Sequence, residues 1–426
     1  MPEGERPGIS RRGFLRAGAA LGGAAVLGGA GGFAAGRSGL AVGGSGSPLP
    51  GSGTDNGRIP FYGAHQAGIA TPAQDRLAIA AFDVIAAQRS DLVAMLKRWT
   101  AAAALMVEGK PVGDVMAAPL APPTDTGEAY GLAPARLTLT AGFGPSLFDA
   151  RFGLAGLRPA ALEALPSLPG DLLDPAISDG DLVVQACADD PQVCFHAVRN
   201  LARLGRGTVV MRWFQSGFGR TSSTSSSQET PRNLMGFKDG TNNIVAEDTS
   251  AMDRFVWVGL EADQPWMRGG TYLVARRIRM LIESWDRDGF LDQEHVFGRQ
   301  KLSGAPLGET AEHDPVPLTA RDVHGDLVIP ADAHIRLAAP SSNGGQRILR
   351  RGYSFTDGTD PVTGQLEAGL FFICFQRDPN TQFVAIQRQL GAHDALDEYI
   401  KHTGSGLFAC PPGLAAGGWW GEALLG

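Results

Sequence analysis

The sequence predicts an α+β fold of two ferredoxin-like halves, each with an antiparallel sheet. Three observations lead to this prediction: predicted strands and helices follow the order β-α-β-β-α-β between residues 76 and 214, a similar alternation recurs after residue 254, and a serine-rich stretch separates the two. Of the 426 residues, 43% are hydrophobic and 19% are charged, which excludes a chain that is disordered throughout. The formal net charge of −7 argues against a protein that works by binding nucleic acid.

The elements of the first half are predicted from hydrophobic periodicity. Strands are expected over residues 76–84, 136–141, 181–187 and 208–214, and helices over 90–107 and 191–204. Asp189 and Asp190 place acidic side chains just before the second helix, where they stabilise its N-terminus. We therefore expect an N-terminal domain over residues 58–220.

The second half repeats this rhythm. Strands are expected over residues 254–258, 271–275, 348–355 and 370–376, and helices over 278–286 and 380–390, with an irregular insertion over 289–327. The repeat is predicted from topology alone, because no sequence identity between the halves is visible. Between them, residues 221–232 contain the run TSSTSSSQE, which predicts a solvated, Ser-rich linker or loop. The C-terminal domain is then expected over residues 233–426.

The N-terminal residues have the composition of an export signal. Residues 1–37 combine a net charge of +3 with a long uncharged run of Ala, Gly, Leu and Val. Arg11 and Arg12, followed by Phe14 and Leu15, match the twin-arginine variety of signal. A membrane-anchoring helix is the alternative, but 17 of the chain's 58 glycines lie in the first 53 residues and would destabilise it. We expect a twin-arginine signal peptide over residues 1–37 and a flexible linker over 38–57.

Three segments contain the polar residues that could support chemistry. The chain has no GxxxxGK[ST], HExxH or GxSxG motif, which excludes several familiar sites. Residues 236–243, GFKDGTNN, are also typical of a turn. His334 lies in an apolar stretch, where a histidine packed in the core is the alternative. Arg350 lies between Arg347 and Arg351, and arginines at the start of a strand are commonly solvated.

Together these segments resemble the dye-decolourising peroxidases, a haem-binding family. Gly236, Asp239 and Gly240 are similar to the GxxDG signature of that family. His334, in AHIRLAAP, stands where the family carries its proximal haem ligand, and Arg350, in ILRRGY, stands at its distal arginine. The resemblance covers nearly all of residues 60–415 and is closest to exported members similar to the deferrochelatase/peroxidase of bacterial iron uptake.

The resemblance implies an enzyme with one haem b per chain, held by the C-terminal half. His334 would bind the iron on one face and leave the other face for hydrogen peroxide. Asp239 would carry the peroxide proton from the inner to the outer oxygen, and Arg350 would contact the haem and stabilise the charge on the departing oxygen. The resulting ferryl intermediate would oxidise a dye, a phenol or another small-molecule reductant.

Further haem contacts are implied by position in the family pattern. They comprise residues that line the haem (Gly240, Thr241 and Asn242) and residues near its propionates (Arg336, Ala339, Pro340 and Ser341). A carboxylate is expected to orient His334, and the candidates are Asp394, Asp397 and Glu398. Gly352 stands where other members have asparagine, so no distal asparagine is expected. Gly236 and Gly240 are expected to let the backbone approach the flat cofactor.

Two alternative functions remain open at this stage. One is a haem-binding protein that extracts iron as part of an iron-uptake system, which the same leader and fold would suit. The other is a non-haem metal protein that uses His295, His313 and His324, whose spacing is irregular. For each function we expect a location in the periplasm, at the cell surface or outside the cell, with no permanent membrane span in the mature chain. Homo-oligomerisation and iron-uptake partners are left open.

Two further groups of residues bear on redox chemistry. Trp285, Trp419, Trp420 and Tyr353 are candidate surface stepping stones for electrons, with simple packing as the favoured alternative. Cys187 and Cys194 could pair outside the cell, but a folded chain exported from a reducing cytosol favours free thiols.

Overall fold

The computed structural model describes residues 57–113 and 119–426, which belong to one compact unit. The predicted signal peptide over 1–37 lies outside the described residues, as does the predicted linker up to residue 56. In the part of the chain that is described, no helix has the length and apolar character needed to span a bilayer.

The first half has the ferredoxin-like order of elements that the sequence predicts. It contains β1 (Arg76–Val84), α1 (Arg89–Met106), β2 (Thr138–Phe143), β3 (Leu182–Ala188), α2 (Pro191–Leu204) and β4 (Val209–Arg220), with short 3-10 turns at Pro145–Leu147, Ala155–Leu157 and Pro175–Ile177. The strands lie in the order β2-β3-β1-β4, and all pairs are antiparallel. The Asp190 carboxylate caps α2 by accepting hydrogen bonds from the backbone N–H groups of Gln192 and Val193.

The second half has the same strand order. It contains α3 (Thr249–Phe255), β5 (Thr271–Met280), α4 (Ile282–Trp285), α5 (Phe290–Phe297), α6 (His334–Ala338), β6 (Leu349–Arg350), β7 (Tyr353–Thr359), β8 (Leu366–Gln376), α7 (Phe383–His393), β9 (Ile400–Cys410) and α8 (Glu422–Leu425), with 3-10 turns at Pro265–Met267, Pro340–Ser342 and Ala395–Glu398. Its antiparallel strands lie in the order β9-β5-β8-β7, and β6 pairs with β8. The predicted α+β fold of two ferredoxin-like halves is therefore confirmed.

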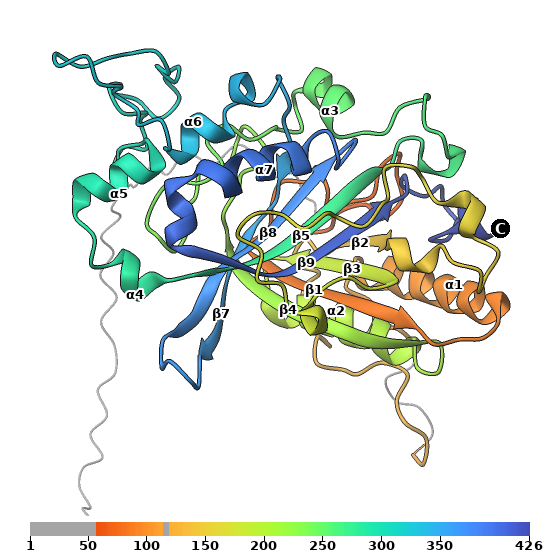
Figure 1. The fold of residues 1–426 in the computed structure, drawn as a ribbon. Helices are drawn as coiled ribbons and strands as arrows, with labels where there is room; N and C mark the ends of the chain where they lie inside the picture. Colours follow the sequence, from red (N-terminus) through yellow and green to blue (C-terminus); the bar gives the residue numbers. More distant parts are fainter. Residues whose placement is uncertain (1–56, 114–118) are drawn as a thin grey trace, which may run out of the picture. The chain divides into compact units, whose positions relative to one another are not determined.

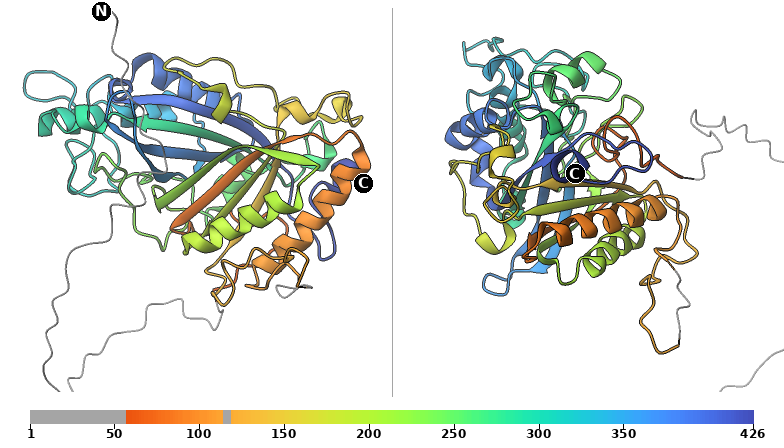
Figure 2. Two further views of the ribbon diagram at one scale, coloured as in Figure 1. Left: turned by 90° about the horizontal axis from the view of Figure 1, so that it is seen from below. Right: turned by 90° about the vertical axis from the view of Figure 1, so that its right-hand side faces the viewer.

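The two sets of strands join into one nine-stranded sheet. Phe143 of β2 pairs with Ala409 of β9, and the end of β4 pairs with the start of β7. Helices α1 and α2 cover one face of the first-half strands (Figures 1 and 2), and their apolar residues form one core with that face. The opposite face packs on the second-half strands through a separate apolar core that includes Ile79, Tyr353 and Phe371.

Three predictions of second-half elements are wrong. Residues 254–258 contain the end of α3 rather than a strand, because the Asp248 side chain caps a helix there by accepting from the Ala251 N–H. The predicted helix 278–286 is wrong outside Ile282–Trp285, which form α4: β5 runs on to Met280, and its arginines form ion pairs with carboxylates across the sheet. The predicted strand 348–355 is divided into β6 and β7.

Strand β9 was not predicted at all. Its sequence, IKHTGSGLFAC, contains two glycines, which are rare in strand interiors. A Cβ at position 404 would lie 2.7 Å from the carbonyl oxygen of Ile177, so the glycine allows another segment to pass close to the strand. This contact between distant segments is not visible in local sequence.

The Ser-rich segment is a loop, but the prediction that it is solvated is wrong for its first part. Residues 221–225 are at most 7% exposed. Their hydroxyl groups find partners inside the protein: Thr224 donates to the Thr71 carbonyl, and Ser225 donates to the Glu247 carboxylate. The polar composition therefore reflects hydrogen bonding in the interior, not contact with water.

The cysteines are free thiols, as expected. Cys187 belongs to the core between the two sets of strands, and Cys194 belongs to the core beneath α1 and α2, so the strands of the first half separate them. The four aromatic residues proposed as surface stepping stones (Trp285, Tyr353, Trp419 and Trp420) are at most 9% exposed. They are not surface residues, which agrees with the favoured alternative of simple packing.

Candidate active site

A cavity of about 250 Å³ lies against the second-half strands, on the face opposite the core between the two sets of strands. Alternate residues of β5 and β8 point to opposite faces, so Ile278 and Phe372 line the cavity while Ala275 and Phe371 lie in the core. Helices α6 and α7 and the loop after β4 complete the wall. Its largely apolar surface suits a flat, hydrophobic ligand.

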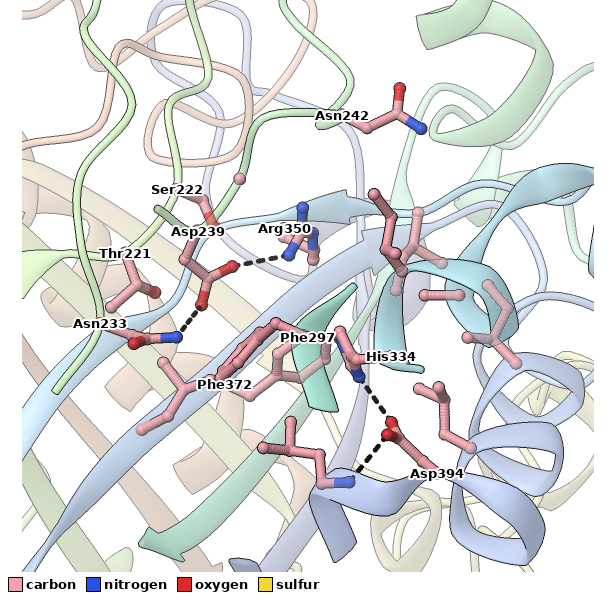
Figure 3. Close-up of a pocket in the computed structure, with 18 of the residues that line it drawn as sticks. Thr221, Ser222, Asn233, Asp239, Asn242, Phe297, His334, Arg350, Phe372 and Asp394 are labelled. Atoms are coloured by element: carbon pink, nitrogen blue, oxygen red, sulfur yellow. Dashed lines mark hydrogen bonds and ion pairs between the residues drawn. The ribbon is translucent and has the colours of Figure 1, made fainter. Parts of the chain in front are cut away.

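One side of the cavity presents His334, the first residue of α6. Its Nδ1 lies 2.6 Å from Oδ2 of Asp394, which is the residue between α7 and the turn Ala395–Glu398 (Figure 3). A carboxylate only accepts hydrogen bonds, so Nδ1 carries the proton and Nε2 keeps a free lone pair. Of the three candidate carboxylates, the structure thus selects Asp394 to orient His334.

Asp394 is itself held in place. Its second oxygen accepts a hydrogen bond of 3.0 Å from the backbone N–H of Leu396, and only 2% of its side chain is exposed. Burial alone would lower the pKa of His334, but the charge and hydrogen bond of Asp394 outweigh it, and the net effect is a raised pKa. The imidazole is therefore rigid and electron-rich, as a metal ligand requires.

The opposite side of the cavity presents Asp239 and Arg350. The Arg350 Nη1 donates to Oδ1 of Asp239 at 2.8 Å, and both side chains are largely buried (Figure 3). Positions 111 residues apart are thus brought together by the turn 236–243 and the short strand β6. Asp239 and Arg350 face His334 across one space, which is the arrangement that the sequence resemblance implies.

Two asparagines complete this side, and the sequence had not pointed to them. Asn233 lines the cavity, and its Nδ2 lies 3.4 Å from Oδ2 of Asp239, so the expectation of no distal asparagine is wrong: one arrives from a different segment. Asn243 donates to the carbonyl of Arg350 at 2.8 Å and accepts from its N–H at 2.8 Å. It thereby ties the turn to β6 and sets the position of Arg350.

The remaining predicted cofactor residues divide into two groups. Residues that line the cavity are Gly240, Thr241, Asn242, Ala339 and Pro340, together with Arg350. Arg336 and Ser341 do not line it. The Arg336 guanidinium instead donates to the carbonyl oxygens of Pro330 and Ile329, at 2.9 and 2.7 Å.

The two glycines of the GxxDG segment have positive φ, +83° at Gly236 and +96° at Gly240. Each of them also has a packing role that the sequence did not predict. A Cβ at Gly240 would lie 2.9 Å from the Cα of Ser222, and one at Gly236 would lie 2.9 Å from Cε of Lys301. These glycines therefore let other parts of the protein pack against the turn.

A non-haem metal centre finds no support in the described part of the chain, where no group of three or more His, Cys, Asp or Glu side chains could hold a metal ion. The three histidines proposed for it form no such group, and His295, His313 and His324 lie at exposed positions. The imidazole of His334, which faces Asp239 and Arg350 across the cavity, is the better candidate for chemistry.

Comparisons with known proteins agree with this geometry. The family model for the N-terminal part of Dyp-type peroxidases matches residues 66–219, and the model for the C-terminal part matches residues 230–415. Curated relatives include deferrochelatase of Escherichia coli K12, 40% identical over 376 residues (87% of this chain and 88% of the relative), and that of Yersinia pseudotuberculosis, 42% identical over 364 residues (84% and 82%). Among solved structures, ferric DtpA from Streptomyces lividans has a TM-score of 0.79 at 41% identity and covers 86% of this chain and 97% of its own. Because the two family models together span most of the chain, and curated relatives match over more than four fifths of both chains, this protein belongs to the Dyp-type (dye-decolourising) peroxidase family.

Proposed function

We propose that this chain is a haem peroxidase that reduces hydrogen peroxide and oxidises small electron donors such as phenols and dyes. The observation that carries the proposal is a single apolar cavity with the His334–Asp394 pair on one side and the Asp239–Arg350 pair on the other. The residues fit haem: one neutral imidazole nitrogen faces the cavity, and the apolar walls suit a porphyrin. In the described residues, no competing set of metal ligands is present.

Bound haem would supply the iron that reacts with peroxide and stores the oxidising equivalents. His334 is the protein ligand for that iron, and Asp394 orients it. The lone pair on Nε2 of His334 would bind the iron. The hydrogen bond from Nδ1 to Asp394 fixes the orientation of the ring and adds negative character to it. Asp394 is thus a positioning residue that acts through His334.

Asp239 and Arg350 handle the proton and the charge of the peroxide. The Asp239 carboxylate can take the proton from the inner oxygen of the peroxide and return it to the outer oxygen. The Arg350 guanidinium, which is a permanent cation, stabilises the negative charge on the departing oxygen. Asn233 and Arg350 both contact the Asp239 carboxylate and limit its rotation.

This function is tested with purified holoprotein. We expect a Soret absorption band and peroxide-dependent oxidation of an anthraquinone dye or a small phenol. His334→Ala should remove the histidine ligand and so change the ligation state of the ferric iron. Asp239→Asn should slow the reaction with peroxide by at least about a hundredfold. Asp253→Asn is the matched control, because Asp253 is an exposed carboxylate on α3 that does not line the cavity. An Asp239→Asn protein that reacts with peroxide as fast as the control would remove Asp239 from the mechanism.

A second candidate function is removal of iron from haem, with release of the intact porphyrin. It is supported by the curated relatives named deferrochelatase, at 40% and 42% identity. Mass spectrometry of the bound tetrapyrrole after incubation separates the two. Iron-free protoporphyrin would support extraction, and intact haem after many peroxide turnovers would support the peroxidase alone.

The proposed setting is outside the cytoplasm, reached through the twin-arginine route. The proposal is supported by Arg11-Arg12 followed by Phe14-Leu15 in a segment of net charge +3. Export of a reporter fused to residues 1–57 should stop when both arginines are replaced by lysine. Export that continues with lysines in place would contradict the route.

A further inference from the structure

The charges that line the cavity are not all compensated. Five cationic side chains line it: Lys238, Arg276, Arg299, Arg347 and Arg350. Three of them have carboxylate partners, because Lys238 pairs with Glu312, Arg276 pairs with Asp171 and Arg350 pairs with Asp239. Arg299 and Arg347 form no ion pair with any carboxylate in the described residues.

The position of Arg299 is set by the turn at the end of α5. Gly298 follows the helix with φ of +76°, and a Cβ there would clash with the side chain of Ile335, so the chain can turn at this point only with glycine. The Arg299 Nη1 donates to the carbonyl oxygens of Gly304 and Glu312, at 2.6 and 3.1 Å. Its Nε and Nη2 donate to no acceptor in the described part of the chain.

The carboxylate nearest to Arg299 is already engaged. Glu312 gives Arg299 only its carbonyl oxygen, while its carboxylate accepts from Lys238 and, at 3.1 Å, from the hydroxyl of Thr241. Burial, opposed by the charge of Glu312 and assisted by that of Arg350, lowers the pKa of Arg299 to about 10. A guanidinium in this position would gain from a second negative charge in the cavity.

Arg347 lies at the other end of the same turn. It comes just before β6, three residues from Arg350, and its Nη2 donates to the carbonyl oxygen of Asn243 at 3.3 Å. Glu312 links Arg299 to Thr241, so a guanidinium without a carboxylate partner is tied to each end of the segment from Thr241 to Asn243. Both guanidiniums line the same cavity as His334.

We propose that Arg299 and Arg347 bind the two propionate carboxylates of the haem. The two carboxylates of haem match the two uncompensated guanidiniums, and a planar guanidinium binds a carboxylate through paired hydrogen bonds. The assignment replaces Arg336, whose guanidinium is occupied by backbone carbonyl groups away from the cavity. This inference rests on the proposed use of haem, but it does not depend on peroxidase activity.

The test compares haem with its dimethyl ester, in which both propionates lack charge. Apoproteins carrying Arg299→Gln or Arg347→Gln are titrated with each porphyrin, and dissociation constants are measured by absorbance and by transfer to apomyoglobin. Each variant should bind haem about tenfold to a hundredfold more weakly than the wild type and bind the ester with unchanged affinity. Arg321→Gln is the matched control, because Arg321 lies in the same insertion, is exposed and does not line the cavity.

A second variant separates charge from folding. Arg299→Lys keeps the positive charge, so it should lose less haem affinity than Arg299→Gln and again none for the ester. Equal losses for haem and ester in the Arg299 and Arg347 variants would overturn the propionate assignment and leave the peroxidase proposal standing, as would no loss for either porphyrin. A selective loss of haem affinity in Arg336→Gln, with none in the Arg299 variant, would restore the assignment to Arg336. A wild-type protein that binds no haem would overturn both proposals.

Discussion

Asp394→Asn should weaken haem binding and raise the reduction potential of the bound iron. The substitution keeps the shape of the side chain and removes the charge that accepts the 2.6 Å hydrogen bond from His334. A hydrogen bond to a charged group contributes about 1.5–3 kcal/mol, so the expected loss of haem affinity is about tenfold to a hundredfold. The same range applies to partners of metal ligands in general.

The reduction potential of the iron distinguishes an electrostatic role of Asp394 from a purely structural one, because a purely structural role would leave it unchanged. The Asp394 carboxylate places negative charge next to the imidazole and so favours ferric over ferrous iron. Without that charge the midpoint potential should shift to more positive values. The potential is measured by spectroelectrochemical titration, and haem affinity by the rate of transfer to apomyoglobin.

The control is Glu398→Gln, which removes a carboxylate from the same turn. Glu398 is exposed and does not line the cavity, so both readouts should match the wild type. The reasoning fails if the folded Asp394→Asn protein retains wild-type haem affinity and potential. It fails equally if Glu398→Gln shifts both as strongly, because the effect would then depend on net charge and not on the hydrogen bond.

The other predictions concern the peroxide side, the pH dependence and the supporting turn. Asp239→Asn and Arg350→Leu should have effects on the rate of reaction with peroxide that do not add in the double variant, because the two side chains share a 2.8 Å hydrogen bond; stopped-flow rates that multiply would show independent action. Burial, and to a smaller extent the charge of Asp394, raises the pKa of Asp397 from 3.8 to about 6. The contribution of this carboxyl group to the free energy of unfolding of the haem-free protein should therefore be complete below pH 4 and be lost as the pH rises through 6. The expected loss is about 1–2 kcal/mol after discounting for partial exposure. Thermal unfolding of Asp397→Asn should lack this loss, and a pH profile identical to the wild type would contradict it. Asn243→Ala should lower the free energy of unfolding by about 1–3 kcal/mol and also slow the peroxide reaction, because it removes two hydrogen bonds to Arg350; lost stability with an unchanged rate would show that Asn243 does not position that arginine.

The fold was predictable where periodicity is local. Strand β1 and helix α2 lie at their predicted residues, because β1 is a nearly continuous apolar run and Asp190 gives α2 a clear start. Prediction failed where an element depends on distant partners. The arginines of β5 form ion pairs with Asp360 and Glu367, and β9 needs Gly404 for close packing against Ile177.

The sequence by itself determined the chemistry of this protein: an isolated histidine, a carboxylate in a GxxDG turn and an arginine after an apolar run, in the order of a known peroxidase family. Only the tertiary structure decided which other side chains contact these three residues and line the cavity with them. Asp394 rather than Asp397 or Glu398 contacts His334 because the turn after α7 presents its oxygen at 2.6 Å. Asn233 reaches Asp239, and Arg299 lines the cavity whereas Arg336 does not, because the path of each loop sets which side chains point inward. Hydrogen bonds act over about 3 Å, so the choice among nearby residues depends on geometry that only packing sets.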